Sequence, residues 1–252
     1  MRALVVIPTY NEAATVGEAL DRALAADPRV DVLVVDDASP DGTGKLVAER
    51  AAAEPRVHLL ERDAKQGLGA AYRAGFAWGL ARGYDALVEM DADLSHPPER
   101  LPALLDGLDA ADVVIGSRYV PGGRTVNWSR LREAISRGGN LYVRLALRLP
   151  VHDATAGYRA YRRQVLEALP VSAVRSGGYC FQIELAHRAW QQGFRVVEVP
   201  ITFTERASGV SKMSQRIVLE ALLRVAGWAV TGGRRRARPL HPQSVVASIQ
   251  AG

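Results

Sequence analysis

Short apolar runs alternate with helix-like segments through the first half of the chain. The apolar runs are rich in valine and leucine, and they cover residues 3–7, 30–35, 57–60, 86–90 and 113–115. The helix-like segments between them cover residues 42–53, 68–81 and 98–108. Nearly all-apolar strands that alternate with helices predict an α/β fold, in which helices cover both faces of a mostly parallel sheet.

The second half has a less regular pattern. It predicts a loop over 120–128, a basic helix over 129–149, an edge strand over 158–161, a helix over 179–192 and a strand over 196–203. Pro200 cannot donate a ladder hydrogen bond, so the last strand is expected at an edge or a bulge. We expect short antiparallel additions to the sheet here. The whole pattern indicates one domain over 1–231, with halves at 1–119 and 120–231, and a basic, disordered tail over 232–252.

The composition excludes some classes of protein and leaves others open. The chain has 252 residues, of which 48% are hydrophobic and 23% charged, which is ordinary for a soluble globular protein. We find no signal-peptide pattern and no apolar stretch long enough to span a membrane, and the single Cys180 suits a reducing compartment, so we expect a cytoplasmic protein. The net charge of +5 comes mainly from arginine. It suits nucleic acid, anionic lipid or phosphorylated small molecules, or it reflects a GC-rich genome.

Two carboxylates follow the fourth apolar run, in the segment Asp91-Ala92-Asp93. Residues i and i+2 of an extended segment point to the same side, so Asp91 and Asp93 would face one spot. Two close anions repel unless a cation lies between them, and Mg²⁺ and Mn²⁺ prefer oxygen ligands. The segment therefore predicts a metal site that holds a phosphorylated substrate, with a solvated turn as the alternative.

Polar residues also follow other apolar runs. Asp37 can accept hydrogen bonds from a nucleotide base or ribose, and Tyr10 can cover a ring face. The alternative is turn and helix-cap chemistry in residues 39–42. Because ligands bind at the carboxyl ends of parallel strands, we expect residues 36–37, 91–93 and 117–118 to gather at one edge of the sheet.

Four of these segments together resemble a known family. Residues 7–12, 35–43, 91–93 and 116–119 resemble family 2 glycosyltransferases, whose Rossmann-like nucleotide-sugar fold is called GT-A. Residues 91–98, 116–119, 153–159 and 206–214 narrow the resemblance to the polyprenol-phosphate (dolichol-phosphate) mannose synthases, over residues 1 to about 230. This resemblance implies metal-dependent transfer of mannose from GDP-mannose to a polyprenyl monophosphate in the membrane.

The resemblance also implies roles for single residues. Asp91 and Asp93 would hold Mg²⁺ or Mn²⁺, with Ala92 between them at the substrate, and Asp93 and Arg118 are the expected catalytic residues. Ser95 stands where many relatives carry Gln, another oxygen ligand. The residues expected at the nucleoside are Pro8, Tyr10, Glu12, Val35 and Asp37. Those expected at phosphate groups are Arg118, Arg206 and Lys212, with Arg132 and Arg137 as candidates for the acceptor phosphate.

The acceptor determines the mechanism. A lipid monophosphate is already ionised, so its oxygen can attack the anomeric carbon without a general base, and direct attack would invert the configuration to give a β-linked product. The protein must bring two anions together, which requires cations on both. We expect Asp153 to order an arginine, and His96, His152 and Cys180 to be structural.

A lipid acceptor requires contact with a membrane. The apolar helical segment at 213–231 could lie in the interface, with Arg224 and residues 234–236 near the headgroups. It could equally pack on the catalytic domain. We expect peripheral association with the cytoplasmic face of the membrane, through the lipid surface or a membrane-protein partner.

Two other functions fit parts of the sequence. A family 2 enzyme could use UDP-glucose or another sugar nucleotide, on polyprenyl phosphate or on a glycan. A glycan hydroxyl would need a catalytic base, and the arginines of the second half would then have no evident use. An arginine-rich nucleic-acid-binding domain is the remote alternative, but acidic clusters at strand ends would repel a phosphate backbone, so we expect no nucleic-acid partner.

Overall fold

The computed structural model describes residues 1–169, 171, 174, 176, 178–205 and 215–231. The strands are β1 (Ala3–Thr9), β2 (Val30–Asp36), β3 (Val57–Glu61), β4 (Ala86–Glu89), β5 (Val113–Ser117), β6 (Arg124–Val126), β7 (Arg159–Arg162), β8 (Val196–Pro200) and β9 (Thr202–Thr204). The helices are α1 (Val16–Ala26), α2 (Thr43–Ala53), α3 (Leu68–Ala81), a 3-10 turn (Pro98–Arg100), α4 (Leu101–Gly107), α5 (Arg130–Leu147), α6 (Arg163–Ala168), α7 (Gly178–Gln191) and α8 (Gln215–Thr231).

Seven strands form one sheet, in the order β3-β2-β1-β4-β7-β5-β8. β1 pairs in parallel with β2 and β4, β2 with β3, and β5 with β8. β7 is antiparallel to both β4 and β5, so it alone runs against the other six. The predicted α/β fold, mostly parallel with short antiparallel additions, is confirmed.

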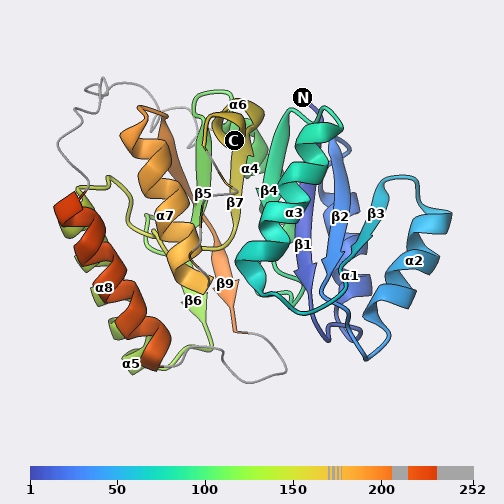
Figure 1. Cartoon of the computed structure of the whole chain (residues 1–252), viewed down its shortest axis with the longest axis horizontal. Helices are drawn as coiled ribbons and strands as arrows, with labels where there is room; N and C mark the ends of the chain where they lie inside the picture. The colour runs from blue at the N-terminus through green and yellow to red at the C-terminus, as the bar shows by residue number, and fades with distance from the viewer. Residues whose placement is uncertain (170, 172–173, 175, 177, 206–214, 232–252) are drawn as a thin grey trace.

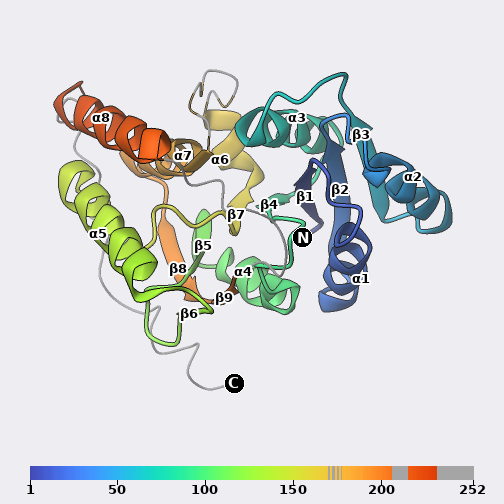
Figure 2. The ribbon, with the colours of Figure 1, turned by 90° about the horizontal axis from the view of Figure 1, so that it is seen from below.

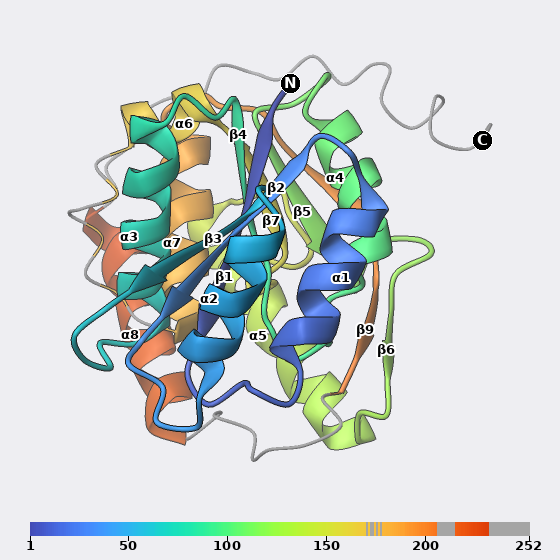
Figure 3. The ribbon, with the colours of Figure 1, turned by 90° about the vertical axis from the view of Figure 1, so that its right-hand side faces the viewer.

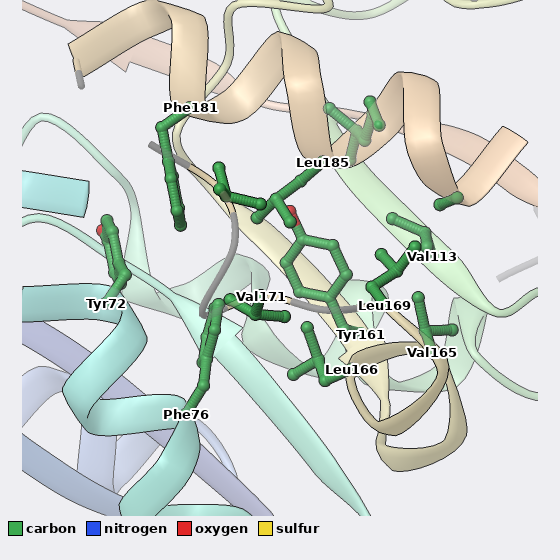
Figure 4. Packing of buried hydrophobic residues seen from close by; sticks show 14 of the residues in the cluster. Tyr72, Phe76, Val113, Tyr161, Val165, Leu166, Leu169, Val171, Phe181 and Leu185 are labelled. Atoms are coloured by element: carbon green, nitrogen blue, oxygen red, sulfur yellow. The ribbon is translucent and has the colours of Figure 1, made fainter. Parts of the chain in front are cut away.

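Helices cover both faces of this sheet, with α3 and α7 on one face and α1 and α4 on the other (Figure 2). Alternate residues of each strand supply the two cores, as the two-residue period of a strand requires. Leu4 and Val6 pack toward α3, whereas Val5 and Ile7 pack toward α1. On the α3 side, the rings of Tyr72, Phe76, Tyr161 and Phe181 stack or meet edge to face across the interface (Figure 4).

Three predicted elements differ from the structure. The single strand expected over 196–203 is divided into β8 and β9, which belong to different sheets. The strand expected at an edge, over 158–161, is instead β7 in the interior of the sheet. Its two arginines resemble an exposed edge in the sequence, but Arg159 is fully buried because its guanidinium donates to three backbone carbonyls. The loop expected over 120–128 contains β6, which pairs in parallel with β9 beside the main sheet, on its α1 and α4 side (Figure 3). The edge position expected from Pro200 is confirmed by β8.

α5 and α8 lie side by side at the end of the molecule opposite α2 and β3 (Figure 1). The hydroxyl of Tyr142 on α5 donates to the carbonyl of Leu222 on α8 at 3.0 Å. The apolar segment predicted over 213–231 is thus mostly α8, and it does pack on the domain. No helix in the described ranges combines the length and the apolar character needed to cross a membrane. Arg206, Lys212 and the tail over 232–252 lie outside the described residues.

Candidate active site

The carboxyl ends of the parallel strands place the predicted polar segments at one edge of the sheet. Asp36 ends β2 and Asp37 follows it, residues 91–93 follow β4, and Arg118 follows β5. Because β7 alone is reversed, all three segments emerge on the same side. The gathering expected from the sequence is therefore confirmed.

The loops after β1 and β2 are tied to each other by hydrogen bonds. Asp36 accepts from Thr9 Oγ1 at 2.6 Å and from the hydroxyl of Ser39, which itself accepts from Asn11 N at 3.0 Å. Asn11 and Ala38 both have positive φ, 61° and 54°, so the chain turns sharply at each. This bracing sets the position of the neighbouring Tyr10 and Glu12, and the strand register sets Pro8 beside Val35.

Asp37 organises a neighbouring loop of the protein itself. Its side chain is buried and accepts from Arg62 Nη1 at 2.7 Å and from the backbone N–H groups of Gln66 and Gly67 at 2.9 and 3.0 Å. These bonds order the segment between β3 and α3. The ammonium of Lys65 in that segment lies 3.7 Å from the ring centroid of Tyr10. The predicted nucleoside site therefore has a loop beside it that the sequence pattern did not indicate.

Residues 91–96 form the carboxylate loop, in which backbone and side-chain donors hold both aspartates. Asp91 N donates to His96 Nδ1 at 3.1 Å, and the Tyr72 hydroxyl lies 3.4 Å from Asp91 Oδ1. Ser95 N donates to Asp93 Oδ1 at 3.1 Å. Leu94 turns the chain with φ 63°. Contacts within the 91–96 segment and with Tyr72 on α3 thus restrain the backbone of Asp91 and the carboxylates of both aspartates.

The donor set of the carboxylate loop fits a hard divalent cation. Asp91 and Asp93 offer carboxylate oxygens, which Mg²⁺ and Mn²⁺ prefer. The hydroxyl of Ser95 is buried and has no hydrogen-bond partner within the described ranges, so an oxygen atom is left over beside the pair. Among the described residues, no three His, Cys, Asp or Glu side chains are grouped as a metal site. A cation at Asp91 and Asp93 would therefore need further ligands, and the metal roles of Asp91, Asp93 and Ser95 stay predictions.

Arg118 is fixed by a buried carboxylate. Asp153 accepts from Arg118 Nε at 2.7 Å, from Nη2 at 2.6 Å and from the backbone N at 3.0 Å. Burial opposes ionisation of this carboxyl, but the Arg118 charge and hydrogen bonds outweigh it and hold the pKa of Asp153 below its usual range. The expectation that Asp153 orders an arginine is confirmed by this geometry.

The segment that carries Asp153 is itself held by side chains of β7 and β8. Arg159 donates to the carbonyls of Ala154 and Ala156, both at 2.6 Å. Glu198 on β8 accepts from the backbone N of His152 and of Asp153. The position of the Arg118 guanidinium is therefore well defined, because β7 and β8 hold the segment that carries its counter-ion Asp153.

A pocket opens between α5, α7 and α8, and Arg118 and Arg132 are among its lining residues. We call it the arginine pocket. Its polar lining includes Ser136 and Thr155, and its wall is mostly apolar, with the side chains of Ile135, Val143, Ile183, Leu222 and Val225. The pocket combines two arginine side chains with a mostly apolar wall. This combination suits a ligand with an anionic head and a hydrocarbon tail.

The structure separates the two arginines predicted on α5. Arg132 lines the arginine pocket and forms an ion pair with Glu205. Arg137 pairs with Glu133 one turn away and stacks over the Tyr119 ring at 4.6 Å, and in the described part of the chain it is not among the pocket's lining residues. Arg118 and Arg132 are thus brought together, and Arg137 stands outside them.

Three pocket features were not predicted from the sequence. They are Trp128, whose ring lies beside both arginines, Thr155, which accepts from Arg118, and the Glu205 partner of Arg132. Trp128 is an isolated aromatic residue in a polar loop, which is the one signal that could have singled it out. Glu205 is 73 residues from its partner, so no local pattern links them.

Comparison with known proteins agrees with this geometry. A family model for glycosyl transferase family 2 matches residues 4–169. The chain is 59% identical to a polyprenol monophosphomannose synthase of Mycolicibacterium smegmatis, over 94% of this chain and 90% of that protein. It is 56% identical to an undecaprenyl-phosphate mannosyltransferase of Micrococcus luteus, over 91% of this chain and 95% of that protein. A solved mannosyltransferase from Pyrobaculum calidifontis, in complex with GDP-mannose and Mn²⁺, shares the fold with a TM-score of 0.65 at 22% identity, over 93% of this chain and 66% of that one.

Proposed function

Because the chain belongs to glycosyltransferase family 2, we propose that it transfers mannose from GDP-mannose to a polyprenyl monophosphate and inverts the anomeric configuration. The observation that carries the proposal is the pairing of the carboxylate loop with the arginine pocket at one edge of the sheet. The carboxylate loop suits a metal-bound diphosphate, and the arginine pocket suits the anionic head of a lipid. The names of the relatives at 59% and 56% identity support the same substrates.

The donor binds at the ends of β1, β2 and β4. Pro8, Tyr10, Glu12 and Asp37 contact the nucleoside, whereas Val35, which was also expected there, is fully buried and supports Pro8 from the neighbouring strand. Asp91 and Asp93 hold Mg²⁺ or Mn²⁺, with Ser95 as a further candidate ligand. A bound divalent ion neutralises charge that builds on the leaving diphosphate. The protein's own part is to keep Asp91 and Asp93 in place, through the hydrogen bonds from Tyr72 and Ser95.

The acceptor phosphate binds between Arg118 and Arg132, and the first isoprene units lie along the apolar wall of the pocket. Charge-assisted hydrogen bonds from two guanidinium groups orient the attacking oxygen and reduce its repulsion from the donor diphosphate. Arg206 and Lys212, which lie outside the described residues, are further candidates for phosphate contacts. The acceptor phosphate is ionised at neutral pH, so its oxygen attacks the anomeric carbon of the mannosyl group directly. GDP leaves from the opposite side, and the configuration at that carbon inverts.

A glycan acceptor is less well supported. Its hydroxyl would need a general base close to the arginines. The two carboxylates that contact these arginines, Asp153 and Glu205, are each engaged in an ion pair. The pKa of Asp153 is lowered by the charge and hydrogen bonds of Arg118, which outweigh the opposite effect of burial, so this carboxylate is a weak base. Both features favour an acceptor that brings its own charge.

The exposed faces of α5 and α8 support peripheral binding to the membrane. Leu131, Leu145 and Leu223 are 71%, 68% and 66% exposed, beside the arginine pocket. Arg130, Arg137 and Arg144 recur every seven residues along α5 and are exposed next to the apolar stripe. An apolar stripe flanked by arginines is typical of helices that lie in an anionic membrane surface. In this arrangement the pocket opens toward the lipid from which the acceptor is drawn, at the cytoplasmic face.

A transfer assay tests the proposal. The protein is incubated with Mg²⁺ or Mn²⁺, radiolabelled GDP-mannose and vesicles that contain a polyprenyl phosphate. We expect label in the lipid extract, release of mannose by mild acid, and a β-anomeric signal by NMR. Parallel reactions use UDP-glucose, the dephosphorylated polyprenol, and EDTA. Absence of lipid label from GDP-mannose, or equal labelling of the polyprenol, contradicts the proposal.

A further inference from the structure

Trp128 lies immediately before α5, at the point where the chain turns from β6 into the helix. Asn127 has a positive φ of 65°, and Ser129 caps the helix by accepting from Arg132 N at 3.2 Å. The turn and the cap together fix the direction in which the Trp128 side chain leaves the backbone. The ring becomes part of the arginine pocket.

The indole ring stands beside both pocket arginines. Its centroid is 4.1 Å from Arg132 Cζ and 5.2 Å from Arg118 Cζ. The ring of Phe203 on β9 meets it nearly edge-on, with centroids 5.6 Å apart. Cations within about 6 Å of an indole face are attracted to it, so Trp128 helps to hold two like charges in one pocket.

Two donor atoms of this group have no acceptor. Trp128 Nε1 and Arg132 Nε are both buried and lack a hydrogen-bond partner among the residues that the structure describes. Most buried donors in native proteins are paired, so each exception calls for an explanation. Both atoms can only donate, since an indole N–H and a guanidinium have no acceptor capacity. A phosphate group, which has several acceptor oxygen atoms, would satisfy both donors.

The charges of the pocket explain why a neutral donor is useful there. Asp153 offsets Arg118, and Glu205 offsets Arg132. A phosphate monoester thus enters a pocket whose two cations already have counter-ions. A neutral N–H adds a hydrogen bond without requiring another counter-ion.

We infer that the indole N–H of Trp128 donates a hydrogen bond to the acceptor phosphate, beside Arg118 and Arg132. Trp128 is then a substrate-contacting residue that recognises the phosphate head of the lipid. The inference rests on the proposed function, because it assigns one contact within the acceptor site. It adds a residue to those expected from the sequence.

Trp128→Phe tests the contact most directly, because phenylalanine keeps an aromatic face for the arginines and removes the N–H. We expect kcat/KM for a polyprenyl phosphate to fall about tenfold, mainly through KM, while the affinity for GDP-mannose is unchanged. Trp78→Phe is the matched control, since Trp78 also stacks on an arginine, Arg82 at 3.8 Å, but lies on α3 away from the pocket. Equal KM values in the wild type and Trp128→Phe overturn the inference.

A second measurement uses the wild-type protein and does not depend on the variant folding. The chain has four tryptophans, so ¹⁵N labelling gives four indole N–H resonances. Farnesyl phosphate should shift one of them downfield, inorganic phosphate should shift the same one at higher concentration, and farnesol should not. If farnesyl phosphate binds and every indole resonance stays in place, the inference is wrong and the proposed function stands. If farnesyl phosphate does not bind at all, both fail.

Discussion

The carboxylate loop and the arginine pocket are built in opposite ways. In the carboxylate loop, the Asp91 backbone and the Asp93 side chain have hydrogen bonds to other residues of the 91–96 segment, and the Tyr72 hydroxyl on α3 approaches Asp91. The pocket joins segments far apart in sequence, and each of its arginines has a carboxylate partner within the protein. Short-range hydrogen bonds thus shape the carboxylate loop, whereas the arginine pocket is assembled by the fold.

This difference predicts that loss of a pocket carboxylate damages stability. Asp153→Asn leaves the buried Arg118 charge without a counter-ion, and breaking such a pair by removing one partner costs about 3 to 5 kcal/mol. For a chain of this size we expect the melting temperature to fall by about 10 °C, measured by calorimetry. Asp109→Asn, at an exposed turn residue just after α4, is the control. An unchanged melting temperature would mean that the pocket does not depend on this pair.

The same pair predicts a dependence on pH. The pKa of Asp153 is lowered in the folded state, so its contribution to stability is complete above the ordinary aspartate range near 4 and is lost as the pH falls through the lowered folded value. The stability difference between the wild type and Asp153→Asn should therefore be constant near neutrality and shrink in acid. Denaturant titrations at a series of pH values measure it, and a difference that shrinks between pH 7 and pH 5 would contradict the assignment.

The carboxylate loop should show the reverse behaviour. Asp93→Asn removes a negative charge from an anionic pair, so we expect the melting temperature to stay the same or rise. Activity should fall about a hundredfold or more, because the diphosphate loses a charge-stabilising partner. The transfer assay and calorimetry on one preparation measure both effects. An Asp93→Asn protein with full activity would refute the metal assignment.

A smaller effect is expected on the exposed face beside the pocket. Leu145→Glu places a charge in the apolar stripe of α5 and should reduce cosedimentation with anionic vesicles about tenfold. Leu46→Glu is the matched control, because Leu46 is a 46% exposed leucine on α2 at the opposite end of the molecule. Equal loss in both variants would indicate a general charge effect. If both variants bind vesicles as well as the wild type does, a membrane protein is favoured as the partner.

The sheet and the carboxylate loop could largely be predicted from the sequence. Apolar runs identify parallel strands, and the order of the strands brings Asp37, Asp91 and Arg118 to one edge. The edge-strand prediction for 158–161 was wrong because the buried Arg159 donates to three backbone carbonyls, two in the preceding segment and one at Gln182 on α7. Patterning shows which residues are polar but not which distant groups satisfy them.

The arginine pocket could be predicted only in part. Arg118 and Arg132 follow from the family resemblance, but their partners Trp128, Thr155 and Glu205 come together only in the fold. The same limit applies to Asp37, whose carboxylate binds the segment between β3 and α3. The neighbouring sequence does not indicate which residues will form contacts with distant parts of the chain.

The central claim is that the two anions of the reaction bind at separate sites with opposite charge requirements. Calorimetric titration of Asp93→Asn and Arg132→Met with two ligands tests it most directly, with Arg163→Met on α6 as an exposed control. Asp93→Asn should lose Mn²⁺-dependent binding of GDP-mannose and bind farnesyl phosphate like the wild type. Arg132→Met should bind GDP-mannose normally and farnesyl phosphate about tenfold more weakly. If each variant loses both ligands, or if Arg132→Met weakens only GDP-mannose, the account of two separate sites is contradicted.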